Sequence, residues 1–417
     1  MKINMSFLNI EYGSISFLKI FYSFLLSIYY FFFNNSKLES KLSSLIKVKY
    51  KSNIFFLKNA RSSLGFFLKS IGIKKNDQVI LNSFTCLAVP FGVLSSGAQP
   101  VYLDINESSL NFNLKSLKKN INKNVKAVVV QHTLGKSADI INIKKFLKKK
   151  NIVLIEDCSL AIGSKFKNKN LGSYGDASIF SMELSKTISS GWGGILLVNK
   201  GSLEKKVRKN YLLLSRDNNI ISFLKHIQIF LSILCLSRYL YFFGKYFYIF
   251  FYKFSIFKPS SLPEEKNAIF RDDIFERLGR FQIILAIIQW KNFDKIIFKC
   301  VENYNKIFNC LKYLNINILP VRSPNEYLVS NRISFLVNNR KKFINYFQKN
   351  NVAVGKWFDG PLSPNPNSTL FNYNKNEFKL AGKISKKIVN LPCNNSLSDS
   401  DCEYIVFLLN RYFKLKK

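Results

Sequence analysis

Between residues 70 and 200, short apolar strands alternate with helical segments, and this alternation constrains the fold more than any other feature of the chain. Strands are predicted at 78–81, 100–104, 127–131, 152–155 and 194–198, with helices at 88–96 and 139–149 between them. Strands that alternate with helices usually pair in parallel, with helices covering both faces of the sheet. We therefore predict an α/β fold with a large domain built on a mainly parallel sheet, followed by a smaller C-terminal α+β domain.

Polar residues follow three of these predicted strands. Gln131-His132-Thr133 ends one strand, Asp157 ends another, and a small polar loop after a further apolar run carries Ser181 and Lys186. Ligands of parallel sheets bind at the carboxyl ends of the strands. The shared placement favours one site over three unrelated polar positions.

The pair formed by Asp157 and Lys186 suggests a specific chemistry. A carboxylate at a strand end and a lysine about thirty residues later suit pyridoxal phosphate, because the lysine forms a Schiff base and the carboxylate pairs with the pyridinium nitrogen. A hydroxyl such as that of Ser181 would hold the phosphate. A lone lysine in a polar loop is usually solvent-facing, so the cofactor interpretation depends on the other segments that fit the same picture.

A helix predicted to open at 60–64 offers a second anion site. Ser62 and Ser63 lie near its amino terminus, where free backbone N–H groups and the helix dipole favour a phosphate. An ordinary serine cap explains the same residues, and both interpretations stay open on local sequence alone.

Several short segments occur in a distinctive order. They are Ser83–Cys86, Gly97–Asp104, Gln131–Asp139, Ile155–Gly163, Gly172–Asp176, Phe180-Ser181, Lys186 ahead of Gly193-Gly194, and Leu391-Pro392 leading into Leu397–Tyr404. In this order and spacing the chain resembles the DegT/DnrJ/EryC1/StrS family of sugar aminotransferases, a branch of the type I pyridoxal-phosphate fold. The resemblance is strong over residues 50–200 and weaker over 320–410.

The resemblance implies roles for the matching positions. Lys186 would bear the cofactor and shuttle a proton between cofactor and substrate carbons, and Asp157 would keep the pyridine nitrogen protonated. The implied phosphate-binding residues are Arg61, Ser62, Ser63 and Ser181. Related enzymes build each active site from two subunits, so the resemblance also implies a homodimer.

Two positions depart from the family pattern. Cys86 stands where the family usually carries an aromatic ring stacked on the cofactor, and Leu160 stands where a glutamine or histidine is expected near the ring hydroxyl. A cysteine stacks poorly and a leucine supplies no hydrogen bond. We therefore expect weaker cofactor binding or a retuned ring at these two cofactor-contacting positions.

These features predict a pyridoxal-phosphate aminotransferase that moves an amino group from an amino acid, with glutamate as the expected donor, onto a nucleotide-linked keto sugar for surface polysaccharide, lipopolysaccharide or glycan biosynthesis. His132 and Trp357 are the candidate substrate contacts, although a core role for Trp357 stays open. One alternative is a sugar dehydratase of the same fold, against which Lys186 argues because those relatives carry histidine there. Another is a degenerate binding or regulatory protein, motivated by Cys86 and Leu160.

Charge and composition narrow the partners. The formal net charge of +38 would normally suggest nucleic acid or anionic membrane. Lysine, asparagine, isoleucine and phenylalanine are enriched together along the whole length, as an AT-rich genome produces, so we expect no nucleic-acid partner. Seven cysteines without a CxxC pair and only two histidines predict neither structural zinc nor another metal site.

Two aromatic stretches complete the predicted organisation. Residues 20–33 form an uncharged run shorter than the roughly twenty residues that a membrane span needs, which favours a docked or interfacial helix over a span. Residues 217–262 are rich in aromatic residues, and a continuous helix would place Arg238, Lys245 and Lys253 in one basic stripe. Such a helix suits peripheral contact with the inner face of the membrane. A buried helical pair with snorkelling lysines is the alternative. The predicted divisions are 1–50, 51–216, 217–262 and 263–417, in a cytoplasmic protein.

Overall fold

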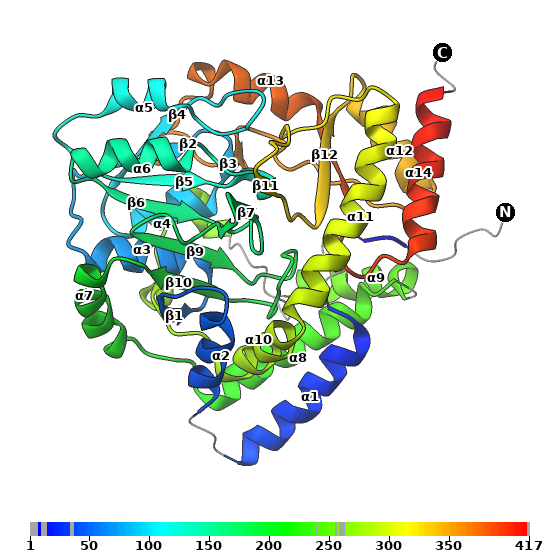
Figure 1. Ribbon diagram of the computed structural model, residues 1–417. Helices are drawn as coiled ribbons and strands as arrows, with labels where there is room; N and C mark the ends of the chain where they lie inside the picture. Colours follow the sequence, from blue (N-terminus) through cyan, green and yellow to red (C-terminus); the bar gives the residue numbers. More distant parts are fainter. Residues whose placement is uncertain are drawn as a thin grey trace.

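A seven-stranded sheet forms the centre of the computed structural model, which describes residues 7–9, 15–33, 37–238, 240–254, 257 and 263–414 (Figure 1). Its strand order is β1 (Asn53–Leu57), β10 (Gly194–Val198), β9 (Ala177–Ser181), β6 (Val153–Asp157), β5 (Val125–Gln131), β2 (Gln78–Asn82) and β4 (Gln99–Leu103). The strands from β9 to β4 are parallel, and β10 is antiparallel to both of its neighbours. The predicted α/β fold with a mainly parallel sheet is confirmed.

Helices cover both faces of this sheet, because its central strands are apolar on both sides. One buried cluster joins the sheet to α2 (Leu38–Lys47), α5 (Leu114–Asn120), α6 (Ile140–Lys149) and α10 (Arg280–Lys291). The opposite cluster joins it to α3 (Ala60–Ser70), α4 (Ala88–Ser95), α7 (Gly201–Leu212) and α13 (Lys379–Lys387). The two layers leave the carboxyl ends of the parallel strands available to the loops that follow them.

The C-terminal part has a hydrophobic cluster of its own. It contains α11 (Phe293–Tyr313), β12 (Arg332–Leu336), α12 (Arg340–Lys349), β14 (Ile388–Pro392) and α14 (Asp399–Lys414). β12 and β14 pair antiparallel, and the three helices pack around them (Figure 1). α10, which precedes this part of the chain, begins at Arg280 after a short 3₁₀ turn at Asp272–Ile274.

Three further helices lie together on one side of the molecule: α1 (Phe17–Phe32), α8 (Asn219–Cys235) and α9 (Tyr241–Lys253) (Figure 1). α1 packs against α8 and α10, and α9 packs against α8. Within the described residues, none of the helices is long and apolar enough to cross a membrane. Part of the predicted 217–262 segment, at 239, 255–256 and 258–262, lies outside the described residues.

The prediction of one basic stripe along residues 217–262 is wrong, because the segment forms two helices, α8 and α9. The chain turns after Cys235, and Arg238 lies in that turn. Its guanidinium donates hydrogen bonds of 2.7 and 2.6 Å to the buried carboxylate of Asp401. Arg238 therefore binds the C-terminal part of the chain, while Lys245 and Lys253 belong to α9.

Candidate active site

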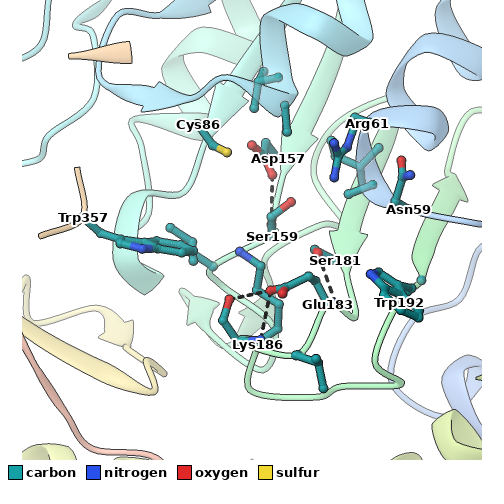
Figure 2. A pocket seen from close by; sticks show the side chains of 18 of the residues that line it. Asn59, Arg61, Cys86, Asp157, Ser159, Ser181, Glu183, Lys186, Trp192 and Trp357 are labelled. Atoms are coloured by element: carbon teal, nitrogen blue, oxygen red, sulfur yellow. Dashed lines mark hydrogen bonds between the residues drawn. The ribbon is translucent and has the colours of Figure 1, made fainter. Parts of the chain in front are cut away.

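A cavity of about 360 Å³ lies at the carboxyl ends of β5, β6 and β9 (Figure 2). The last residue of each of these strands, Gln131, Asp157 and Ser181 respectively, contributes to its wall. Asn59, Arg61, Cys86, Leu160, Glu183, Lys186, Trp192 and Trp357 line it as well. The structure thus brings most of the predicted site residues into one chamber.

Asp157 ends β6 with its side chain turned to the cavity (Figure 2). Its Oδ1 accepts a 2.9 Å hydrogen bond from the backbone N–H of Ser159, and its backbone carbonyl accepts one of 3.0 Å from the N–H of His132. The carboxylate is 4% exposed. These bonds fix a negative charge at the base of the chamber.

Lys186 reaches into the same cavity from the loop after β9 (Figure 2). Burial lowers the pKa of its amine; the negative charge of Glu183 opposes that shift and the positive charge of Arg332 adds to it. Its Nζ lies 4.6 Å from the centre of the Trp357 ring, and the Arg332 guanidinium lies 3.9 Å from the same ring. A lowered pKa increases the fraction of uncharged, nucleophilic amine.

The loop that carries Lys186 is held from both sides. The carbonyl of Ser185 accepts hydrogen bonds from Asn331 Nδ2 at 2.7 Å and Arg332 Nη2 at 3.2 Å. Glu183 accepts hydrogen bonds from the backbone N–H and the hydroxyl of Ser185. Asn331 and Arg332 were missed by sequence reasoning; their signal was an arginine inside an otherwise apolar strand, which needs partners when buried.

The N-terminal end of α3 borders the cavity at a site suited to an anion. Asn59 caps the helix by accepting a 2.8 Å hydrogen bond from the backbone N–H of Ser62. Arg61 lines the cavity and forms an ion pair with Glu265. Ser62 and Ser63 are fully buried outside the cavity wall, and the Ser63 hydroxyl donates to the carbonyl of Asn59. The prediction that these two side chains contact the phosphate is therefore corrected, because neither lines the cavity.

Cys86 and Leu160 both line the cavity, as their proposed places beside a cofactor require. Burial raises the pKa of the Cys86 thiol, so the thiol is protonated near neutral pH. The aromatic surfaces in the wall come instead from Trp192, Tyr248, Trp357 and Phe358. Trp192 was also missed from the sequence.

His132 lies outside the cavity, which corrects its prediction as a substrate contact. Its ring is fully buried: Nε2 is 2.9 Å from Glu156 Oε2, and Nδ1 accepts a hydrogen bond from the N–H of Ala138. Glu156 also accepts hydrogen bonds from the backbone N–H groups of Gly172, Tyr174 and Gly175. Cys158 lies beside this pair, and burial holds its thiol pKa well above the ordinary value. These bonds account for the cluster as a structural network.

Part of the cavity wall comes from the aromatic segment. Gln228 and Ser232, one turn apart on α8, and Tyr248 on α9 line the chamber. Ile229 packs so closely on the lysine loop that a side chain at Gly191 would meet its Cδ1 at 2.3 Å. Sequence reasoning treated this segment as separate from the site.

Comparison with known proteins identifies the family. The model of the DegT/DnrJ/EryC1/StrS aminotransferase family matches residues 33–217 and 276–410, which is most of the chain. The chain belongs to this family. It is 34% identical to GDP-perosamine synthase of Vibrio cholerae over 163 residues, a match that covers 39% of the chain and less than half, 44%, of that protein. It is 32% identical to a UDP-N-acetyl-3-dehydro-α-D-glucosamine 3-aminotransferase of Acidithiobacillus ferrooxidans over 142 residues, 34% of the chain and 38% of that protein.

Solved structures with the family's fold superpose on nearly the whole chain. Helicobacter pylori PseC, an aminotransferase of pseudoaminic acid biosynthesis, gives a TM-score of 0.71 at 17% identity and covers 98% of this chain and 100% of its own. The PLP form of Spr1654 from Streptococcus pneumoniae gives 0.74 at 15% identity, with 98% and 99% covered. At these identities the likeness shows the fold.

The residues around the cavity fit pyridoxal phosphate. The wall offers a buried amine at Lys186, a buried carboxylate at Asp157, and an anion site formed by the start of α3 with Arg61 and Ser181. Asp157 is close enough for its charge to act on Lys186. An amine, a carboxylate and a phosphate site in one chamber match the three polar ends of this cofactor.

Proposed function

We propose that the protein is a pyridoxal-phosphate-dependent aminotransferase that moves an amino group onto a keto sugar. The observation that carries this proposal is the placement of Lys186 and Asp157 in one buried cavity at the strand ends of a chain of this family. When bound, the cofactor supplies an electron sink for the carbon from which a proton is removed.

Different residues of the chain would have separate roles in this reaction. Lys186, whose pKa burial lowers, would hold the cofactor covalently between turnovers and then carry the proton between the substrate carbon and the cofactor carbon. Asp157 would hold a proton on the pyridine nitrogen by its fixed negative charge. Arg61, Ser181 and the start of α3 would bind the phosphate, and Trp357 would cover the amine and border the sugar.

The proposed substrates are a nucleotide-linked keto sugar and an amino-acid donor, with glutamate as the first candidate. The names of the relatives support the nucleotide carrier, since one makes a GDP-linked amino sugar and another acts on a UDP-linked keto sugar. We propose a role in surface polysaccharide, lipopolysaccharide or glycan biosynthesis. We also propose a homodimer in the cytoplasm, with peripheral membrane contact through 217–262.

An absorbance titration tests the cofactor chemistry. Purified protein mixed with pyridoxal phosphate is expected to develop a visible band that borohydride bleaches, and Lys186→Ala is expected to lose it. Lys356→Ala is the matched control, because Lys356 is an exposed lysine beside Trp357 that does not line the cavity. Wild-type protein with no band would overturn the proposal and favour the degenerate binding protein that Cys86 and Leu160 motivate.

The substrate assignment needs a separate measurement. Wild-type protein is incubated with glutamate and a panel of GDP-, UDP- and dTDP-linked keto sugars, and mass spectrometry follows conversion to the amino sugar. Loss of the sugar's hydroxyl without nitrogen incorporation would instead identify the dehydratase, a result that Lys186 in the cavity argues against.

A further inference from the structure

The three helices α1, α8 and α9 carry a large exposed apolar surface, here called the three-helix face. On and beside α1 it consists of Phe17, Leu18, Phe21, Tyr22, Leu25, Ile28, Tyr29, Phe32 and Phe33. On α8 and around α9 it consists of Ile220, Ile221, Leu224, Leu240, Phe242, Phe243, Tyr246, Phe247, Ile249, Phe250, Tyr252 and Phe254. α1 and α9 both adjoin α8, and the three helices that carry these residues lie on one side of the molecule (Figure 1). Soluble monomers rarely expose apolar patches of this extent.

The polarity of α1 is the reverse of that of a helix on a water-soluble protein. Its buried residues are Ile20, Ser23 and Ser27, whereas most of its aromatic residues are exposed. Phe24 and Phe31 instead pack inward, against Phe223 of α8. Ser23 Oγ is joined by a 3.2 Å hydrogen bond to His226 Nε2 on α8. Small and polar residues between the helices with large apolar residues outside are typical of helices surrounded by lipid.

The inner side of α9 shows the same pattern. Its buried residue is Gly244, and a side chain there would meet the carbonyl oxygen of Cys235 at 1.9 Å. The backbones of α8 and α9 therefore approach closely through a glycine, and most rings of α9, among them Phe243, Tyr246 and Phe247, are exposed. The three-helix face is the outer surface of a well-packed unit.

The charges at this face are basic. Residues 12–38 and 218–263 contain no aspartate or glutamate. Lys225 and Arg238 are bound internally by Asp217 and Asp401. Lys19, Lys245 and Lys253 remain beside the exposed rings without an acidic neighbour in their own helices. Aromatic rings flanked by lysines complement the acyl boundary and the phosphates of anionic lipid.

All three helices also lie outside the part of the chain that matches the family. The match covers 33–217 and 276–410, so α1 precedes it and α8 and α9 fall in its gap. The catalytic framework is thus accounted for without them.

We propose that the three-helix face docks onto an anionic lipid bilayer, with the helices along the interface and the rings of α1 and α9 in the acyl boundary. The helices are proposed to lie along the interface because, with 16, 17 and 13 residues, they are too short to cross a bilayer. A second copy of the chain is the rival occupant of this face, and the measurements below distinguish the two.

Docking would also bring the cavity to the membrane surface. The helices that form the face carry Gln228, Ser232 and Tyr248 in the cavity wall, and Ile229 contacts the lysine loop. Trp192 packs against the hydrophobic cluster that contains Ile229 and Ile233 of α8, and it lines the cavity, so its fluorescence is expected to respond when the outer side of α8 meets lipid.

Vesicle flotation with the full-length protein tests the docking. We expect the protein to float with phosphatidylcholine vesicles containing one part in three phosphatidylglycerol, and to float at least tenfold less with phosphatidylcholine alone or in 0.5 M salt. Phe21→Glu with Phe247→Glu should lower the partition coefficient at least tenfold. Tyr313→Glu is the matched control, since Tyr313 is a 75% exposed ring at the far end of α11.

The outcomes separate this proposal from its rivals. Failure of the wild type to float, or flotation unchanged by Phe21→Glu with Phe247→Glu, overturns it. Ultracentrifugation that shows a dimer dissociated by those substitutions, without lipid binding, assigns the face to a second copy instead. The absorbance band with pyridoxal phosphate should persist in the variants, so loss of docking and failure of the proposed chemistry are read independently.

Discussion

Glu156, the buried carboxylate next to Asp157, is expected to be the most costly single polar residue to remove near the site. It is fully buried and accepts four hydrogen bonds, from His132 and from the backbone N–H groups of three residues in the turn before β9: Gly172, Tyr174 and Gly175. Glu156→Ala would leave these donors without an acceptor. Breaking a buried charged pair typically costs about 3–5 kcal/mol.

The expected change in melting temperature follows from the size of the chain. An unfolding entropy of about 2.1 cal/mol/K per residue gives roughly 0.9 kcal/mol per kelvin for 417 residues, so Tm should fall by about 3–6 °C. Differential scanning calorimetry at pH 7 measures this. The control is Glu204→Ala, which removes a partly exposed i,i+4 pair with Arg208 on α7 and should lower Tm by about 1 °C or less.

The loss of stability caused by Glu156→Ala should also depend on pH. Burial alone opposes ionisation of Glu156, but the hydrogen bond from His132 and those from the N–H groups of Gly175 and Gly172 outweigh it and lower the pKa of the carboxyl. A lowered folded-state pKa stabilises the protein above the unfolded value of 4.5, and that stability is lost as the pH falls through the folded value. The Tm gap between wild type and Glu156→Ala should therefore narrow below about pH 4.5. A gap under 1 °C at pH 7, or one equal to that of Glu204→Ala, refutes the reasoning.

Three further predictions use the site and its wall. Arg332→Leu removes a positive charge that lowers the pKa of Lys186, so that pKa should rise, and borohydride trapping with pyridoxal phosphate should require higher pH than in wild type; an unchanged or lower pH midpoint would contradict this. Burial lowers the pKa of His226 to about 4, below the value of 6.5 in the unfolded chain. The free energy of unfolding should therefore fall by up to about 3 kcal/mol as the pH is lowered from 6.5 to 4. In urea titrations, His226→Leu should show a smaller decline over this pH range. In Gly191→Val the new side chain would clash with Ile229, and the backbone φ of +84° at this position is strained for valine. The free energy of unfolding should therefore fall by at least about 2 kcal/mol, and tryptophan emission should shift. Unchanged emission would show that α8 does not pack against the lysine loop.

The sheet and the main site could be predicted from the sequence because they depend on local patterns of apolar and polar residues. Buried parallel strands appear as apolar runs, and the residue that ends each run marks the ligand edge, as Asp157 and Ser181 do. The same logic failed for His132: successive side chains at a strand end point in different directions, so Gln131 faces the cavity and His132 faces Glu156.

Other features depend on contacts between distant segments. Arg332 reaches the carbonyl of Ser185 across 147 residues, and no local pattern predicts that pairing. Along α3 each residue turns by about 100°, so Arg61 lines the cavity while Ser62 is buried beside it. The break after Cys235 has neither glycine nor proline to announce it, and accompanies the bonding of Arg238 to Asp401.

The wall that α8 and α9 contribute to the cavity has an evolutionary consequence. Lys186 and Asp157 lie in the stretches that the family model matches, whereas Gln228, Ser232 and Tyr248 lie in the gap between those stretches. Three residues of the chamber wall are therefore apart in the sequence from the groups of the proposed transfer. Substitutions in α8 and α9 can reshape this part of the chamber while Lys186 and Asp157 stay constant.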